Sequence, residues 1–239
     1  MSFPKIEHPT YTVDLSIGQV TYRPFLVKEQ KILMMAHNTQ NIDAVVDALK
    51  VIVHNCIVAP ANLDIAAMPL SDLTHLFLHL RARSMGEKMK VYFKCTNEFE
   101  GKPCGMVLED EVDLLEVKPE GGGGNPVIMI TKDIGVHMHY PSFDLLNLIM
   151  KNQSSIEAEF IVMAGCIDYV FDANGRHNVA DASVEEVQKF VTDLPEDKYN
   201  LLKSFVSNAP TIKKTIRKNC VKCNYAHEMV LEGLSDFFV

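Results

Sequence analysis

Four of the six cysteines stand in two pairs whose residue type and spacing suit a metal ion. Eight residues separate Cys95 from Cys104, and two separate Cys220 from Cys223. Zinc prefers four thiolate or imidazole ligands in a tetrahedron, and a Cys-x2-Cys loop can bring two thiolates to one ion by itself. The spacing therefore predicts a structural zinc site formed by these four cysteines, with His227 as a reserve ligand.

A closed site of four thiolates leaves no open coordination position, so we expect a structural and not a catalytic ion. Two other interpretations stay open for the same residues: free structural thiols, or a disulfide. The remaining cysteines, Cys56 and Cys166, each lie in a segment predicted to be a helix with an apolar face. We expect both to be buried thiols of the core.

Histidines supply the other candidate ligands, and each has a plainer interpretation. His75 and His79 are four residues apart, but the residues between them are Leu-Phe-Leu, so the glutamate of a zincin motif is missing. We interpret them as an unliganded pair beside an apolar stripe. His137 and His139 share one face of a predicted strand, as two polar residues on a half-exposed surface would. No Ser/His/Asp or Cys/His order can be argued, so the sequence predicts no enzyme.

A basic run over residues 213–222 lies beside the Cys-x2-Cys pair, and on a zinc ribbon it could contact phosphate. It predicts the main alternative function, a nucleic-acid-binding zinc-ribbon protein that uses this strand. A solvated face is the preferred interpretation, because no aromatic side chains are interleaved as a stacking platform. The formal net charge of −8, from 23 Lys and Arg against 31 Asp and Glu, also disfavours unspecific binding to nucleic acid.

The elements that must position the first cysteine pair follow from hydrophobic periodicity. Alternating polarity predicts strands, and apolar residues at steps of three and four predict helices. In the first half the predicted elements are a hairpin over 11–25, helices over 27–37, 42–56 and from residue 71 onward, and strands over 89–94 and 106–117. The strand at 89–94 runs directly into Cys95 and so positions the first pair.

The second half repeats this pattern. Its predicted elements are strand-like residues 127–140, a short helix after Pro141, helices over 154–171, 183–191 and 195–207, and a strand over 211–218 that leads into Cys220. Ser154 with Glu157, and Ser183 with Glu186, form the Ser-x-x-Glu pattern of a capping box.

Both halves run in the order strand, proline, helices, strand, cysteine pair, strand. We interpret this order as an internal duplication, although short apolar words also recur by chance. The predicted fold class is α+β, with two related helix-rich halves, short antiparallel strands, and a zinc-ribbon-like four-cysteine site that joins the halves. The predicted division is a first half over 1–120, a Gly-rich linker over 121–126 and a second half over 127–239, folded as one cooperative unit.

Composition places the chain among soluble globular proteins. The 239 residues are 47% hydrophobic and 23% charged, which disfavours collagen, coiled coil and wholesale disorder. The first eight residues lack the apolar run of a signal peptide, and no stretch reaches the roughly 18 apolar residues of a spanning helix. We therefore expect a reducing compartment, with thiols free or on a metal, and no membrane partner.

One segment resembles a known family. Tyr22 to Ala36 reads YRPFLVKEQKILMMA and follows the predicted hairpin. It is similar to a signature of baseplate hub proteins from contractile-tailed phages of the T-even type, and the paired cysteines resemble those of the family as well. No catalytic residues carry over. Within the segment, Phe25, Val27, Lys28 and Glu29 are candidates for a specific surface. For Phe25, Val27 and Ile32 the preferred interpretation is the inner face of the first amphipathic core helix.

The resemblance implies a structural or assembly protein of the central hub of a phage tail baseplate, acting through protein–protein contacts. The implied partners are other hub and spike proteins. The implied location is the host cytoplasm during assembly, and the virion tail baseplate if the protein stays in the finished particle.

Overall fold

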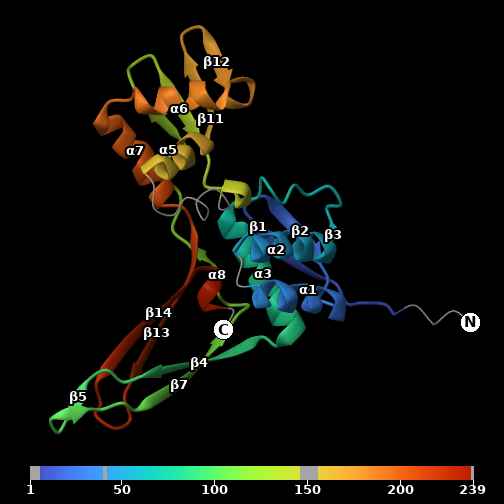
Figure 1. Cartoon of the computed structure of the whole chain (residues 1–239), viewed down its shortest axis with the longest axis vertical. Coiled ribbons are helices and arrows are strands. Elements are labelled where there is room, and N and C mark those ends of the chain that lie inside the picture. Colours follow the sequence, from blue (N-terminus) through green and yellow to red (C-terminus); the bar gives the residue numbers. More distant parts are fainter. Residues whose placement is uncertain (1–5, 40–41, 146–155, 238–239) are drawn as a thin grey trace, which may run out of the picture.

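The computed structural model of the chain describes residues 6–39, 42–145 and 156–237. Two lobes, one from each half of the sequence, lie towards one end of the molecule, and a stem of β-hairpins projects away from them (Figure 1). Helices and short antiparallel strands make an α+β fold, as predicted. No helix among the described residues is both long and apolar enough to cross a membrane.

The first lobe packs helices against a small sheet of strand order β1-β2-β3. Its elements are β1 (Tyr11–Leu15), β2 (Gly18–Tyr22), α1 (Val27–Asn38), α2 (Ile42–Cys56), β3 (Ile57–Ala59) and α3 (Leu70–Met85). The three predicted helices are confirmed, each starting within one residue of its predicted start, and the predicted hairpin is confirmed but ends at Tyr22, three residues before its predicted bound. Their apolar faces meet in one core that includes Val20, Tyr22, Ile52, Leu76 and Phe77.

The second lobe is built around a sheet of strand order β12-β11-β10-β9. Its elements are β9 (Val127–Met129), β10 (Gly135–Met138), α5 (Ile156–Gly165), β11 (Ile167–Asp172), β12 (Gly175–Asn178), the 3-10 turn η1 (Val179–Asp181), α6 (Val184–Thr192) and α7 (Glu196–Ser207). This lobe has its own core, which includes Val136, Met163, Ile167, Val191 and Leu202.

One predicted helix in this lobe is wrong in its second part. The helix predicted over 154–171 ends at Gly165, and residues 167–172 form β11, which pairs with β12 in a hairpin that the periodicity did not reveal. Ile167, Val170 and Phe171 fall at helical spacing, but β-branched and aromatic side chains pack well on a half-buried strand. Cys166 therefore lies at the junction of α5 and β11 and not on a helix.

One of the two predicted capping boxes lies among the described residues. The capping box at Ser183 is present, because the Glu186 N–H donates to Ser183 Oγ at 3.2 Å and the Ser183 N–H donates to Glu186 Oε2 at 2.8 Å. The cap predicted at Ser154 lies outside the described residues. So does most of the helix predicted after Pro141, of which residues 143–145 are described and helical.

Two antiparallel hairpins form the stem (Figure 1). The first pairs β4 (Lys88–Lys94) with β7 (Val107–Asp113), and the second pairs β13 (Thr211–Asn219) with β14 (Ala226–Glu232). Minor elements complete this part of the chain: β5 (Glu98–Phe99), β6 (Lys102–Pro103), β8 (Pro119–Glu120) and α8 (Gly233–Asp236). At the base of the stem, a third core joins Leu78 of α3, Val112 of β7, Ile216 of β13 and Phe237, so both halves contribute to it.

The two halves share a detail of backbone pairing. The Arg23 N–H, just after β2, donates to the carbonyl oxygen of Cys56 at 2.9 Å, and the His139 N–H, just after β10, donates to that of Cys166 at 2.8 Å. Cys56 is the last residue of α2, and Cys166 directly follows the last residue of α5. Each precedes a strand that pairs with the hairpin, and each of these pairings has a register shift near its end.

The glycine run packs against the second half of the chain. Gly121, Gly122 and Gly123 have φ of 91°, 78° and 80°, a left-handed conformation that favours glycine. The Gly122 N–H donates to the carbonyl oxygen of Asn208 at 2.9 Å. A Cβ added at Gly122 would lie 2.7 Å from Cγ of Pro210, whereas one at Gly123 would meet nothing within 4 Å.

Gly122 and Gly123 therefore form a matched pair for mutation. Gly123→Ala should lower the free energy of unfolding by about 1–2 kcal/mol, the cost of a left-handed alanine. Gly122→Ala carries the same cost and should lose roughly 1–3 kcal/mol more, because its methyl group collides with the rigid Pro210 ring. Urea denaturation of the two variants measures the difference, and equal losses would show that the run does not pack closely on Pro210.

Candidate metal centre

The four cysteines lie at the tips of the two stem hairpins. Cys95 follows β4 and Cys104 precedes β7, while Cys220 follows β13 and Cys223 precedes β14. Backbone hydrogen bonds close both tips, since the Cys95 N–H donates to the Met106 carbonyl and the Cys220 N–H to the Tyr225 carbonyl, each at 2.8 Å. The hairpins that the sequence predicted around each pair thus present two thiols apiece to the same point.

The sulfur atoms form a compact group. Cys95 Sγ lies 3.5 Å from Cys223 Sγ, Cys104 Sγ lies 3.8 Å from Cys220 Sγ, and all four atoms lie within 4.8 Å of one another. A tetrahedral ion with metal–sulfur bonds of about 2.3 Å requires sulfur atoms about 3.8 Å apart. The distances fit such an ion and are too long for a disulfide, which needs about 2.05 Å. The cysteines are free thiols in the structure, and the group could hold a metal ion.

The protein environment shifts the pKa of Cys95 and that of Cys223 in opposite directions. Burial and the neighbouring thiols raise the pKa of Cys95 above its ordinary value. Burial also acts to raise the pKa of Cys223, but hydrogen bonds from the Tyr225 backbone N–H, from the Asn97 side chain and from the other thiols outweigh it and leave that pKa lowered. Asn97 Nδ2 lies 3.7 Å from Cys223 Sγ. Negative charge is therefore better accommodated at Cys223 than at Cys95, and a cation at the centre of the group would favour the thiolate form of its ligands.

His227 lies at the edge of the group. Its Nε2 is 3.1 Å from Cys95 Sγ, and its ring contacts the rings of Phe93 and Tyr225 edge-on at centroid distances of 5.8 and 4.9 Å. It thus hydrogen-bonds a cysteine and does not stand among the four sulfurs. Leu108 is buried against the cysteines and helps to exclude water from the group.

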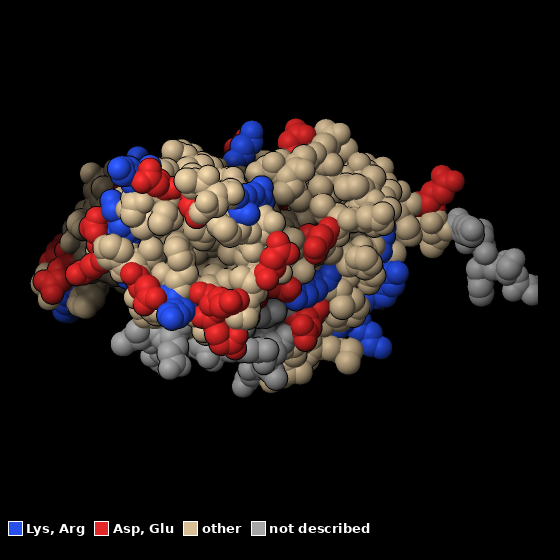
Figure 2. Space-filling view, turned by 90° about the horizontal axis from the view of Figure 1, so that it is seen from above, with Lys and Arg blue, Asp and Glu red and all other residues tan. Residues whose placement is uncertain are grey.

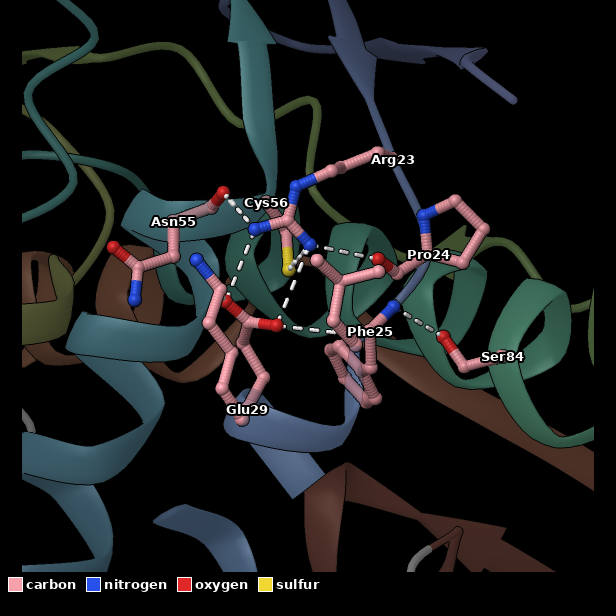
Figure 3. Close-up of polar contacts among 9 residues, drawn as sticks. Arg23, Pro24, Phe25, Glu29, Asn55, Cys56 and Ser84 are labelled. Carbon is pink, nitrogen blue, oxygen red and sulfur yellow. Dashed lines mark hydrogen bonds and ion pairs between the residues drawn. The ribbon is translucent and has the colours of Figure 1, made fainter. Parts of the chain in front are cut away.

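The start of α1 holds an ion pair that the sequence analysis missed (Figure 3). Arg23 donates to Glu29 Oε1 at 3.0 Å, to the carbonyl oxygen of Asn55 at 2.7 Å and to that of Pro24 at 2.9 Å. Glu29 is fully buried and also accepts from the Leu26 N–H at 2.9 Å. The signal was an Arg and a Glu six residues apart on either side of a proline, but nothing local in the sequence shows that both point inward.

A family model described as "T4 bacteriophage base plate protein" matches residues 8–239. The chain belongs to this family. Its similarity to "Baseplate hub assembly protein gp26" of Enterobacteria phage T4 is 26% identity over 233 residues, covering 95% of this chain and 97% of that protein. No solved structure matches the chain. The family predicted from the segment Tyr22 to Ala36 is thus confirmed.

The signature segment of this base plate protein is divided between core and surface. Phe25 and Ile32 pack against the first core, as an amphipathic helix requires, and Glu29 is buried with Arg23. Val27 is 82% exposed, so its assignment to the inner face is wrong. The side chain of Lys28 is also exposed. Of the four candidates for a specific surface, only Val27 and Lys28 have exposed side chains.

The other two cysteines are buried in the cores, and two of the paired histidines make hydrogen bonds within the protein. Cys56 and Cys166 are fully buried, as predicted, and burial raises their pKa to about 11 and about 12. His79 accepts or donates a hydrogen bond with the Tyr22 hydroxyl at 3.3 Å, and burial and its neighbours lower its pKa to about 4. Within the described part of the chain, His75 and His79 belong to no group that could hold a metal. His137 Nδ1 instead pairs with Asp168 at 2.8 Å.

The basic run on β13 is largely matched by acidic neighbours. Arg217 pairs with Glu228 at 2.8 Å, Lys213 lies opposite Glu232 in the β13–β14 register, and Lys218 lies 3.6 Å from Asp110. These acidic neighbours of β13 suit a solvated stem better than a phosphate-binding groove. Figure 2, which looks down on the lobes, shows basic and acidic groups interspersed there as well.

A gel-shift assay tests the nucleic-acid alternative directly. We expect no shift of single- or double-stranded DNA or RNA at low salt, because the acidic groups beside Arg217, Lys218 and Lys213 compete with phosphate for these cations. A shift that weakens with added salt, and that Lys213→Glu with Arg217→Glu abolishes, would contradict this expectation.

Proposed function

We propose that this protein is a structural or assembly protein of the central hub of a phage tail baseplate, and that it acts through protein–protein contacts and not through catalysis. The observation that carries the proposal is the family match over residues 8–239, with near full-length similarity to a hub assembly protein. The site is consistent with this role, because a closed group of four cysteines offers no open position for a substrate.

We further propose that Cys95, Cys104, Cys220 and Cys223 bind one structural zinc ion. The support is the ligand type, the sulfur–sulfur separations and the buried, hydrogen-bonded setting. Thiolates favour zinc among the abundant divalent ions, and the tetrahedral fit agrees with its preferred geometry. The ion would connect two hairpins that are more than a hundred residues apart in the chain, which restricts the unfolded state considerably.

The chain organisation is part of the same proposal. We infer a duplication of one unit, with halves over 1–120 and 127–239 and the glycine run between them. Matching backbone bonds at Cys56 and Cys166 support it. The shared core at the base of the stem and the shared cysteine group argue that the halves unfold together.

We infer that the partners are other hub and spike proteins, met in the host cytoplasm while the baseplate is built. Purification of the tagged chain from infected cells tests this inference. Hub and spike proteins should co-purify with it during tail assembly, and an unrelated late phage protein with the same tag is the control. Absence of these proteins from the purified material would defeat the proposed function.

A further inference from the structure

We propose that the outer face of α1 is a docking surface for an acidic amphipathic helix of a partner protein. This face, called the α1 strip, consists of Val27, Lys28, Lys31, Met34 and Met35. The inference rests on the proposed function in one respect, since the partner is expected among the baseplate proteins.

The α1 strip is apolar where solvent would favour polar residues. Val27 is 82% exposed, and Met34 and Met35 are each 60% exposed. With Lys31 they occupy positions i, i+4, i+7 and i+8, which lie on one side of a helix. The opposite side of α1 carries Ile32, Leu33 and Ala36, which face the first core. The strip is therefore a second apolar face of α1, against which an amphipathic helix of another protein can pack.

The strip is held in place before any partner arrives. Arg23 and Glu29 fix the first turn of α1 from inside the lobe, and the Phe25 N–H donates to Ser84 Oγ of α3 at 2.7 Å (Figure 3). A surface that is already ordered loses less conformational entropy on binding. Methionine side chains remain adaptable within that fixed frame, which suits contact with an irregular apolar surface.

Charge selects the kind of partner. Glu29 is the one acidic residue of α1, and it is buried against Arg23. The exposed charges of the helix are therefore Lys28 and Lys31, on a chain whose net charge is −8. A basic and apolar strip is complementary to an apolar helix flanked by Asp and Glu, and it would repel a basic one.

Site-specific photo-crosslinking in infected cells tests this surface on the full chain. Benzoylphenylalanine placed at Met34 or at Met35 should crosslink to an acidic, helix-forming segment of another baseplate protein, identified by mass spectrometry. The matched control is the same crosslinker at Leu201, which is 48% exposed on α7 of the other lobe and should give no such product.

A charge-reversed pair gives a second measurement. Lys28→Glu with Lys31→Glu should reduce the crosslink yield at Met34 by about tenfold or more, while Lys28→Arg with Lys31→Arg should retain it. Lys28 Nζ also lies 3.5 Å from Glu29 Oε1, so circular dichroism must show that the lobe of both variants is folded. Lys31→Glu alone leaves that ion pair intact and should still reduce the crosslink yield.

The outcomes separate this inference from the proposed function. If hub proteins co-purify with the chain but the α1 strip gives no crosslink, the docking surface is wrong and the proposed function stands. Crosslinks only to a second copy of this chain, to nucleic acid or to a segment without acidic residues would also overturn the inference. If no hub protein co-purifies at all, both proposals fail.

Discussion

Native mass spectrometry of the purified chain should show one bound zinc ion, and Cys220→Ser should remove it. A serine hydroxyl stays protonated near neutral pH and cannot replace a thiolate, so three sulfurs and a weak oxygen would remain. We expect zinc affinity to fall by more than about 100-fold, which exceeds the usual effect of losing an outer contact. Cys166→Ser is the matched control, because that thiol is equally buried but belongs to the second core. It should keep the ion.

Loss of the ion should affect the stem far more than the lobes. The cysteine group has few apolar neighbours of its own, whereas each lobe has a separate core. In Cys220→Ser, or after treatment with a strong chelator, amide hydrogen exchange at the stem tips should accelerate by about tenfold or more, and exchange in the lobe cores should change little. A metal-free native protein with a fully protected stem would contradict the zinc proposal.

Arg23→Met should lower the free energy of unfolding by about 3–5 kcal/mol. The substitution removes the buried cationic partner of Glu29 and leaves only the exposed Lys28, at 3.5 Å, as a counter-charge for a buried carboxylate. Removal of one partner is the costly way to disturb a buried ion pair. The double variant Arg23→Met with Glu29→Leu is the control, and it should recover much of the loss because no charge then remains buried. Urea denaturation measures all three proteins, and a loss below about 0.5 kcal/mol in Arg23→Met would show that the pair is not needed.

The same ion pair predicts a pH dependence. Burial raises the pKa of Glu29, but hydrogen bonds from Arg23 and the Leu26 N–H, with the nearby charges of Arg23 and Lys28, outweigh burial and lower it below its ordinary range. A carboxyl whose pKa is lower in the folded state contributes stability above its unfolded pKa, about 4.3, and loses it as pH falls through the folded pKa. Part of the acid destabilisation of the native protein should therefore be absent in Glu29→Gln.

These two sites stabilise different levels of the structure. The ion pair fixes how α1 leaves the first hairpin, and so it fixes the α1 strip. The cysteine group ties together two hairpins that begin in different halves of the chain. A surface held in place in this way, such as the proposed α1 strip, loses less conformational entropy when a partner binds.

Much of the local structure could be predicted from the sequence. The Cys-x2-Cys pair, the period-two strand before Cys95 and the capping box at Ser183 are short-range patterns, and the same patterns appear in the structure. Residues within a few positions of one another decide such features, so one sequence suffices to find them. The prediction of a helix over 167–171 was wrong because it too used only short-range spacing. Apolar residues at helical spacing can equally line a strand when a neighbouring strand is available.

The sequence by itself determined which cysteines pair within each hairpin, and its resemblance to phage hub proteins indicated the family. Only the tertiary structure decided that the two pairs converge on one point, that Glu29 turns inward while Val27 turns outward, and that the glycine run lies against Pro210. Each of these depends on contacts between segments far apart in the chain. Such contacts form when separate apolar faces are buried together, and a single sequence does not show which faces will meet.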